Sequence, residues 1–368
     1  MPIAIIYFAQ VTGSFASGMT VFSIMMLSSA ILEVPTGVLS DLLGRKKTMM
    51  LGGVAGTLSI LSYALAHSFV LLAIGAGLEG LMTALYSGNN NAFLHDTLKQ
   101  EGREEEYAHK LGRTSSFFQL GRGTSAILGS AIAFFFSLSA VFWAGVLPRF
   151  VCVLVCLFMI EPKIHIEDIS TNTFSHLKEA FMQFKRNAKL KTLSLATILD
   201  FGLGQAAYLF TPAFFSIFWP VWAMGFARTV SNFTAFVSFW FAGNFIKHFK
   251  PLQSLMAVKA GSHLVSFFAY GVPTVFSPFI LSCLSIGYGV KTVGENTLLQ
   301  KEFTDTQRAT MGSLNQFGGS VLFAVVAYFL GFFADYIGPR NVLLIIECIL
   351  FMGLFLYWKV FHHEGRSN

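Results

Sequence analysis

The sequence predicts an all-helical protein that crosses a membrane many times and is organised as two helical bundles. Hydrophobic residues make up 54% of its 368 residues and charged residues only 12%, and the mean hydropathy is +0.62. Soluble domains carry about 25% charged residues, so this composition excludes a soluble globular fold. The apolar runs are continuous rather than alternating, which argues against a membrane β-barrel.

Eleven apolar stretches are long enough to cross a hydrocarbon core of about 30 Å as helices, which takes about 20 residues. We expect these spans near residues 19–40, 48–66, 69–96, 115–136, 141–160, 191–214, 221–246, 251–271, 274–299, 309–334 and 341–359. The apolar stretch at residues 1–11 would be about 17 Å long as a helix, too short to span alone. We expect it to end a truncated first helix that begins about 10 to 25 residues upstream.

The basic residues are concentrated in every second loop. Three of these loops, Arg45–Lys47, Lys99–Arg113 and Lys163–Lys191, are the most basic, whereas the intervening turns hold only Arg340. By the positive-inside rule, the basic loops and the C-terminus face the cytoplasm of a multi-pass cell-membrane protein. The net charge of +6 therefore reports topology and does not indicate a nucleic-acid partner.

A long polar stretch that begins at Glu161 separates the spans into two groups. It predicts an N-terminal helix bundle over 1–160, a cytoplasmic linker over 161–190 and a C-terminal helix bundle over 191–368. Within the linker, apolar residues at helical spacing predict a short interfacial helix, through Phe174, Leu177, Phe181 and Phe184. A faint repeat, Ser116–Gly121 and Ser313–Gly318, indicates that the two bundles are related.

The most specific local pattern is EVPTGVLSDLLGRKKTMMLG, which forms a tight hairpin between the first two full spans. Such a hairpin needs small residues where backbones meet, here Gly37 and Gly44, and charges at the membrane surface. The charges are those of Asp41, Arg45 and Lys46. An aspartate at this place can pair with a base or face the N-terminus of a neighbouring helix.

This hairpin resembles the signature loop between helices 2 and 3 of the major facilitator superfamily, which reads approximately G-x-L-x-D-x-x-G-R-K. The matching residues are Gly37, Leu39, Asp41, Gly44, Arg45 and Lys46. The resemblance implies the major facilitator fold with two six-helix bundles, here eleven full spans plus the truncated first helix. It also implies a conformational latch in which Asp41 and Arg45 pair with Asp96 and the hairpin contacts the start of helix 11.

Besides the truncated first helix, the resemblance is incomplete at two places. The equivalent hairpin of the second half, Ala242–Lys247, lacks the aspartate and the arginine. The fifth family helix, Leu120–Ser130, lacks the Gly-Pro pattern that is typical of drug/proton antiporters.

Ten ionisable residues fall inside the predicted spans, where each is energetically costly and therefore a candidate for function. They are Glu33, Glu79, Asp200, Glu295, Glu347, Arg122, Arg149, Arg228, Lys259 and Lys291. The equal numbers of acids and bases indicate internal pairing, which can serve transport or only hold helices in register.

The family resemblance implies that helices 1, 4, 7 and 10 line the central cavity, which selects Glu79, Asp200, Lys291 and Glu295 as candidates for substrate binding or proton coupling. Glu79 or Asp200, with no base within one helical turn, is expected to carry the coupling proton. Arg122 is the expected cross-bundle partner of Glu79. Lys291 and Glu295 lie four residues apart on one helix face, so we expect them to neutralise each other.

The predicted function is secondary active transport of a small solute by alternating access, coupled to protons, by a monomer in the lipid bilayer. No nucleotide-binding loop of the Gly-x-x-x-x-Gly-Lys-Ser/Thr type occurs in the sequence, and no cysteine or histidine spacing indicates a metal site, a cofactor or an enzyme. Three alternatives stay open: a transporter-like receptor, an inactive truncated relic and a drug/proton efflux antiporter.

Overall fold

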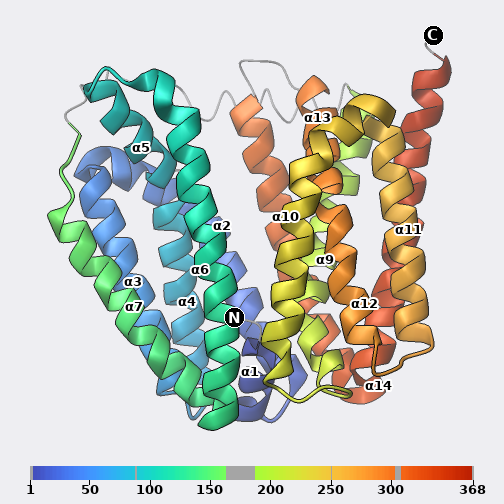
Figure 1. The fold of residues 1–368 in the computed structure, drawn as a ribbon, viewed down its shortest axis with the longest axis horizontal. Helices are drawn as coiled ribbons and strands as arrows, with labels where there is room; N and C mark the ends of the chain where they lie inside the picture. The colour runs from blue at the N-terminus through green and yellow to red at the C-terminus, as the bar shows by residue number, and fades with distance from the viewer. Residues whose placement is uncertain (1–2, 88, 163–186, 250, 303–307, 367–368) are drawn as a thin grey trace. The chain divides into compact units, whose positions relative to one another are not determined.

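The computed structural model describes residues 3–87, 89–162, 187–249, 251–302 and 308–366, and these contain helices and connecting turns but no strand. Internal contacts divide the chain into two compact units, an N-terminal unit over Ile3–Ser170 and a C-terminal unit over Thr171–Asn368. Figure 1 shows that each unit is a bundle of long helices running alongside one another. The interfacial helix expected at residues 174–184 lies outside the described residues.

The N-terminal unit contains seven described α-helices. They are α1 (Ala4–Thr12), α2 (Phe15–Leu43), α3 (Arg45–Ala64), α4 (Phe69–Tyr86), α5 (Asn89–Gln100), α6 (Tyr107–Phe135) and α7 (Leu138–Phe158), with a 3-10 turn at Glu104–Glu106. Within this unit, α4 packs against both α2 and α3, α3 packs against α7, and α6 packs against α7. Serine side chains cap two helices, because the hydroxyl of Ser14 accepts from Ser17 N and that of Ser137 accepts from Ala140 N.

The C-terminal unit is also a helix bundle (Figure 1). Its helices are α9 (Ala188–Phe215), α10 (Ala223–Phe249), α11 (Pro251–Gly271), α12 (Ser277–Cys283), α13 (Tyr288–Glu302) and α14 (Arg308–Arg366). The last of these is two helices joined at Gly338, whose φ of 82° is left-handed and whose successor is Pro339. α14 packs against α9 and α11, and α13 packs against α10 and α11.

The described helices occupy the positions of the predicted spans, with breaks inside two spans that were predicted to be continuous. The predicted span 69–96 is divided into α4 and α5, because the backbone becomes extended at Ser87. The predicted span 274–299 is divided into α12 and α13 by a 3-10 segment, Leu284–Gly287. Just after it, Gly289 lies so close to α10 that a Cβ atom would stand 2.5 Å from Phe239 N, and its N–H donates to Ser238 Oγ.

By length and composition alone, five helical segments of the described chain could cross a membrane. They are Phe15–Gly37, Phe69–Gln100, Leu138–Phe158, Ala188–Phe215 and Met311–Lys359. The other helices are too short or less apolar: α1 has only 9 residues, and α3 begins with three consecutive bases.

Candidate functional site

Two of the predicted acids, Asp200 of α9 and Glu295 of α13, share one lysine that the sequence did not select as a site residue. Lys259 of α11 forms an ion pair with Asp200 Oδ2, and its Nζ lies 2.6 Å from Glu295 Oε1. The side chain of Lys259 is 4% exposed, whereas those of Asp200 and Glu295 are 17% and 18% exposed. One buried ammonium therefore ties three helices of the C-terminal unit together.

Tyr357, in the second half of α14, completes this cluster. Its hydroxyl lies 2.7 Å from Asp200 Oδ2 and 3.1 Å from Glu295 Oε1. The hydroxyl has a single proton, so it can donate to only one of the two carboxylates at a time. Lys259 Nζ also lies 4.6 Å from the centroid of the tyrosine ring, a cation–π distance. We call Asp200, Lys259, Glu295 and Tyr357 the Lys259 cluster.

The expected pair of Lys291 and Glu295 is wrong, because Glu295 binds Lys259 of the facing helix instead. Residues four apart share a helix face, but a lysine on an adjacent helix can approach the carboxylate more directly than a neighbour on the same helix. Lys291 interacts electrostatically with Asp200, Glu295 and Glu347. Among the described residues it forms no ion pair of its own.

Glu79 is paired within the N-terminal unit, with a different arginine from the one expected. Its Oε1 lies 3.7 Å from Arg149 Nη2 of α7, and both side chains are about one-third exposed. Arg122 instead places its guanidinium 5.7 Å from the ring centroid of Phe118 on its own helix. The prediction of an Arg122–Glu79 pair is therefore wrong, because α4 packs against α3 and α2 while α6 packs against α7.

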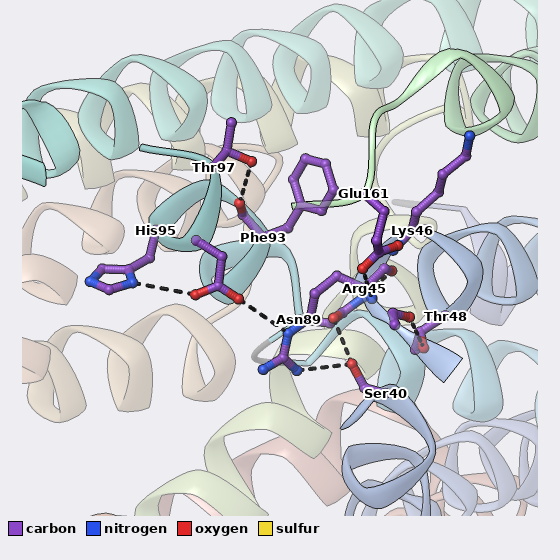
Figure 2. A network of polar contacts seen from close by, with 11 residues as sticks. Ser40, Arg45, Lys46, Thr48, Asn89, Phe93, His95, Thr97 and Glu161 are labelled. Carbon is purple, nitrogen blue, oxygen red and sulfur yellow. Dashed lines mark hydrogen bonds and ion pairs between the residues drawn. The ribbon is translucent and has the colours of Figure 1, made fainter. Parts of the chain in front are cut away.

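The predicted hairpin joins the end of α2, the start of α3 and α5 through polar contacts (Figure 2). Arg45 Nε lies 3.5 Å from Asp96 Oδ2, and Arg45 Nη1 donates to Ser40 Oγ at 2.9 Å. Buried Asn89 accepts from Ser40 Oγ at 2.8 Å and donates to the carbonyl of Arg45 at 3.0 Å. The side chain of Asp41 and the start of helix 11 near Arg308 lie outside the described side chains.

Glu161, which the sequence analysis placed only at the start of the linker, binds this hairpin. Its Oε1 accepts from Arg45 N at 2.6 Å and its Oε2 from Lys46 N at 2.7 Å. These are the first N–H groups of α3, which lack partners inside the helix and attract a negative charge. Lys46 also donates from Nζ to the carbonyl of Leu157 at 2.8 Å. The end of α7 is thereby attached to the hairpin.

The hairpin glycines differ in what they contact. Gly44 has a φ of 91°, and a Cβ there would stand 2.8 Å from Glu161 Oε1, so both its backbone and its surroundings require glycine. At Gly37, no atom lies within 4 Å of the place a Cβ would take. The expectation of a close backbone approach at Gly37 is therefore not met within the described residues.

Long apolar helices packed around interior ion pairs define a helical membrane protein. The sequence profile of the Major Facilitator Superfamily matches residues 1–327. The chain belongs to this superfamily, whose members are transporters rather than enzymes, and it is a multi-pass membrane protein.

Known proteins resemble the chain in sequence and in fold. The uncharacterized transporter BU466 of Buchnera aphidicola subsp. Acyrthosiphon pisum (strain APS) is 30% identical over 134 residues, a match that covers 36% of this chain and 33% of the relative. The chain thus aligns with only about a third of that relative.

Three solved structures share the fold. The nucleoside transporter NupG has a TM-score of 0.80 at 16% identity, covering 98% of this chain and 93% of NupG. A bacterial homologue of the human lysosomal transporter Spinster has a TM-score of 0.75 at 14% identity, covering 98% and 92%. A D-xylose–proton symporter has a TM-score of 0.72 at 12% identity, covering 94% and 87%.

Proposed function

We propose that this protein is a proton-coupled secondary transporter in which the Lys259 cluster binds the coupling proton. The observation that carries the proposal is the sharing of one ammonium by two carboxylates, Asp200 and Glu295. Two carboxylates that share a site resist simultaneous ionisation, and a proton on either one relieves their repulsion.

Protonation of this cluster would change which helices are held together. When Asp200 takes the proton, Lys259 keeps its ion pair with Glu295, so α11 stays attached to α13 and its attraction to α9 weakens. When Glu295 takes the proton, the preference reverses. Proton binding would therefore favour one helix arrangement over another, as coupling to alternating access requires.

The descriptions of the structural relatives suggest which class of substrate to test. One is described as a nucleoside transporter and another as a D-xylose–proton symporter. Both descriptions support a small polar solute, and the second supports coupling to protons. Nucleosides and pentoses are therefore the first solutes to test.

The test uses the purified protein in proteoliposomes with radiolabelled nucleosides and pentoses. A solute that exchanges across the membrane by counterflow identifies a substrate. We expect an imposed pH gradient to drive that solute to accumulate and a protonophore to abolish the accumulation. Accumulation that persists unchanged in the protonophore would contradict proton coupling. Binding without any counterflow would instead favour the receptor alternative.

We also infer that Arg45 and Asp96 act as a conformational latch on one face of the membrane. Their contact, the Ser40–Asn89 hydrogen bond and the Glu161 carboxylate together fix the α2–α3 hairpin to α5 and α7. Partly exposed ion pairs contribute about 0.2–1 kcal/mol each. That is enough to alter the balance between two conformations whose free energies differ by a few kcal/mol.

A further inference from the structure

A second buried ionisable pair lies in the C-terminal unit and has no part in the Lys259 cluster. His263 Nδ1 of α11 lies 2.8 Å from Glu347 Oε2 of α14. The two side chains are 9% and 12% exposed. An ionisable pair inside a membrane-spanning bundle is costly, and its default interpretation is a role in moving ions or substrate.

The pair lies next to the Lys259 cluster along the same helix. His263 follows Lys259 by four residues in α11, so the two share a helix face about 6 Å apart along the axis. Lys291 of α13 interacts electrostatically with Glu347 as well as with Asp200 and Glu295. A charge change at one site is therefore felt at the other through Lys291.

Other groups also surround the pair. On the same helix, Tyr270 interacts electrostatically with Glu347, and its carbonyl accepts a hydrogen bond from Arg340 Nε at 2.8 Å. The titratable groups that interact with Glu347 are thus Tyr270 on α11, a neutral phenol, and Lys291 on α13. Lys259 lies one helical turn from His263, and the guanidinium of Arg340 binds the carbonyls of Tyr270 and Gly271 rather than the pair.

The charges of this network balance only if one more proton is bound. Lys259 and Lys291 supply two positive charges. The three carboxylates, Asp200, Glu295 and Glu347, supply three negative charges, so a neutral His263 leaves the network one negative charge in excess. A neutral imidazole keeps one free ring nitrogen that can bind a proton, which makes His263 the natural acceptor of the balancing proton.

We propose that His263 and Glu347 form a second proton-binding site that exchanges protons with the Lys259 cluster, an inference that rests on the proposed proton coupling. An ionised Glu347 can only accept a hydrogen bond, so Nδ1 of His263 carries the hydrogen that faces it. The incoming proton then binds Nε2 and converts the imidazole to imidazolium. When the proton leaves Nε2 for a carboxylate of the cluster, no other bond is made or broken.

The first test observes the histidine directly in the full chain. Protein labelled with ¹⁵N-histidine is reconstituted in lipid, and the His263 signals are assigned by their loss in His263→Gln. We expect them to change from the neutral to the charged form as the pH is lowered across the range in which the protein stays folded. We also expect Asp200→Asn to shift the midpoint of this change. A single protonation state across that range would overturn the proposal, and a midpoint unmoved by Asp200→Asn would overturn the exchange with the cluster.

The second test measures transport in proteoliposomes. We expect His263→Gln and Glu347→Gln to keep counterflow and to lose the wild-type pH dependence of gradient-driven accumulation. The matched control, His67→Gln, changes an exposed histidine in the turn between α3 and α4 and should keep that dependence. A wild-type pH profile in both buried variants would overturn the second site. If His263 titrates while Asp200 and Glu295 variants accumulate solute normally, the proposed coupling cluster is wrong and the His263–Glu347 site stands.

Discussion

The carboxylate of Glu161, three residues beyond the end of α7, accepts the backbone N–H of Arg45 at a distance of 2.6 Å. Its second oxygen accepts from the next amide, that of Lys46. The first turn of α3 has no acidic residue of its own, so a distant residue supplies the negative charge that helix N-termini favour. Glu161, the first residue of the predicted linker, thus stabilises the start of α3 in the hairpin that carries the family signature.

We expect Glu161→Gln to destabilise the protein, because the amide keeps one acceptor oxygen and loses the negative charge. Hydrogen bonds to charged groups contribute about 1.5–3 kcal/mol, and the variant should lose part of this. The measurement is thermal unfolding in detergent, compared with Glu104→Gln in the exposed 3-10 turn. Equal unfolding temperatures in the two variants would show that the carboxylate does not stabilise α3.

Gly44→Ala should be more harmful than a glycine substitution inside a helix. The left-handed φ of 91° strains any side chain there, and the new methyl group would meet Glu161 Oε1. Strain of this kind costs about 1–3 kcal/mol. Gly37→Ala is the matched control, because it adds a methyl group to open space in α2 and should be neutral or slightly stabilising.

A double variant separates the two causes at Gly44. Removing the carboxylate with Glu161→Ala should recover part of the Gly44→Ala loss, so the combined effect would be smaller than the sum. Fully additive losses in unfolding free energy would show that backbone strain alone makes Gly44 necessary.

The helices and their order could be predicted from the sequence because a membrane span needs only a long apolar run, which is a local property. The choice of ion-pair partner could not, because it depends on which helix faces meet. Glu79 therefore binds Arg149 rather than Arg122. Tyr357 was missed because it is uncharged and lies in an apolar run, and its role appears only where α14 meets Asp200.

Contacts between distant segments also bear on the breaks in two predicted spans. Hydropathy continues through Leu284–Gly287, so nothing local predicts that interruption, whereas Ser87 begins a polar run to Asn91 that the predicted span disregarded. Asn89, just after the first break, is held by Ser40 and by the carbonyl of Arg45. Both contacts come from segments more than 40 residues away, and a sequence window cannot include them.

Glu302, at the end of α13, should give the protein a stability that depends on pH. Burial alone would raise the pKa of Glu302, but Lys189 and Asn187 of the α9 start bind the carboxylate and hold its pKa below the ordinary 4.5. A lowered folded-state pKa stabilises the protein above the ordinary value, and this contribution is lost as pH falls through the folded-state pKa.

Glu302→Gln should therefore unfold at a lower temperature than wild type at neutral pH, and the difference should shrink as the pH falls below the ordinary value. Unfolding temperatures of both proteins measured across acidic pH check this. A difference that does not change with pH would show that the carboxylate charge contributes nothing. Glu105→Gln, an exposed acid in the 3-10 turn, is the control.

Removing the latch should shift the balance of conformations without loss of folded protein. Because Arg45 and Asp96 are partly exposed, we expect Asp96→Asn to change the ratio of conformations by at most about fivefold. Accessibility labelling of single cysteines on both faces, in a background without the four native cysteines, measures the ratio. Arg103→Gln, in an exposed ion pair with Glu101 and Glu106, should leave the labelling unchanged. If Asp96→Asn also leaves it unchanged, the hairpin charges have only a topological role.

The sharing of Lys259 by Asp200 and Glu295 is tested most directly by comparing accumulation with counterflow in neutral variants of the two acids. We predict that Asp200→Asn and Glu295→Gln keep counterflow of the substrate but lose accumulation driven by the pH gradient. Glu33→Gln, which neutralises an acid that contacts Ser87 in the N-terminal unit, should keep both activities. Wild-type accumulation by both neutral variants would contradict the assignment of the coupling proton to this cluster.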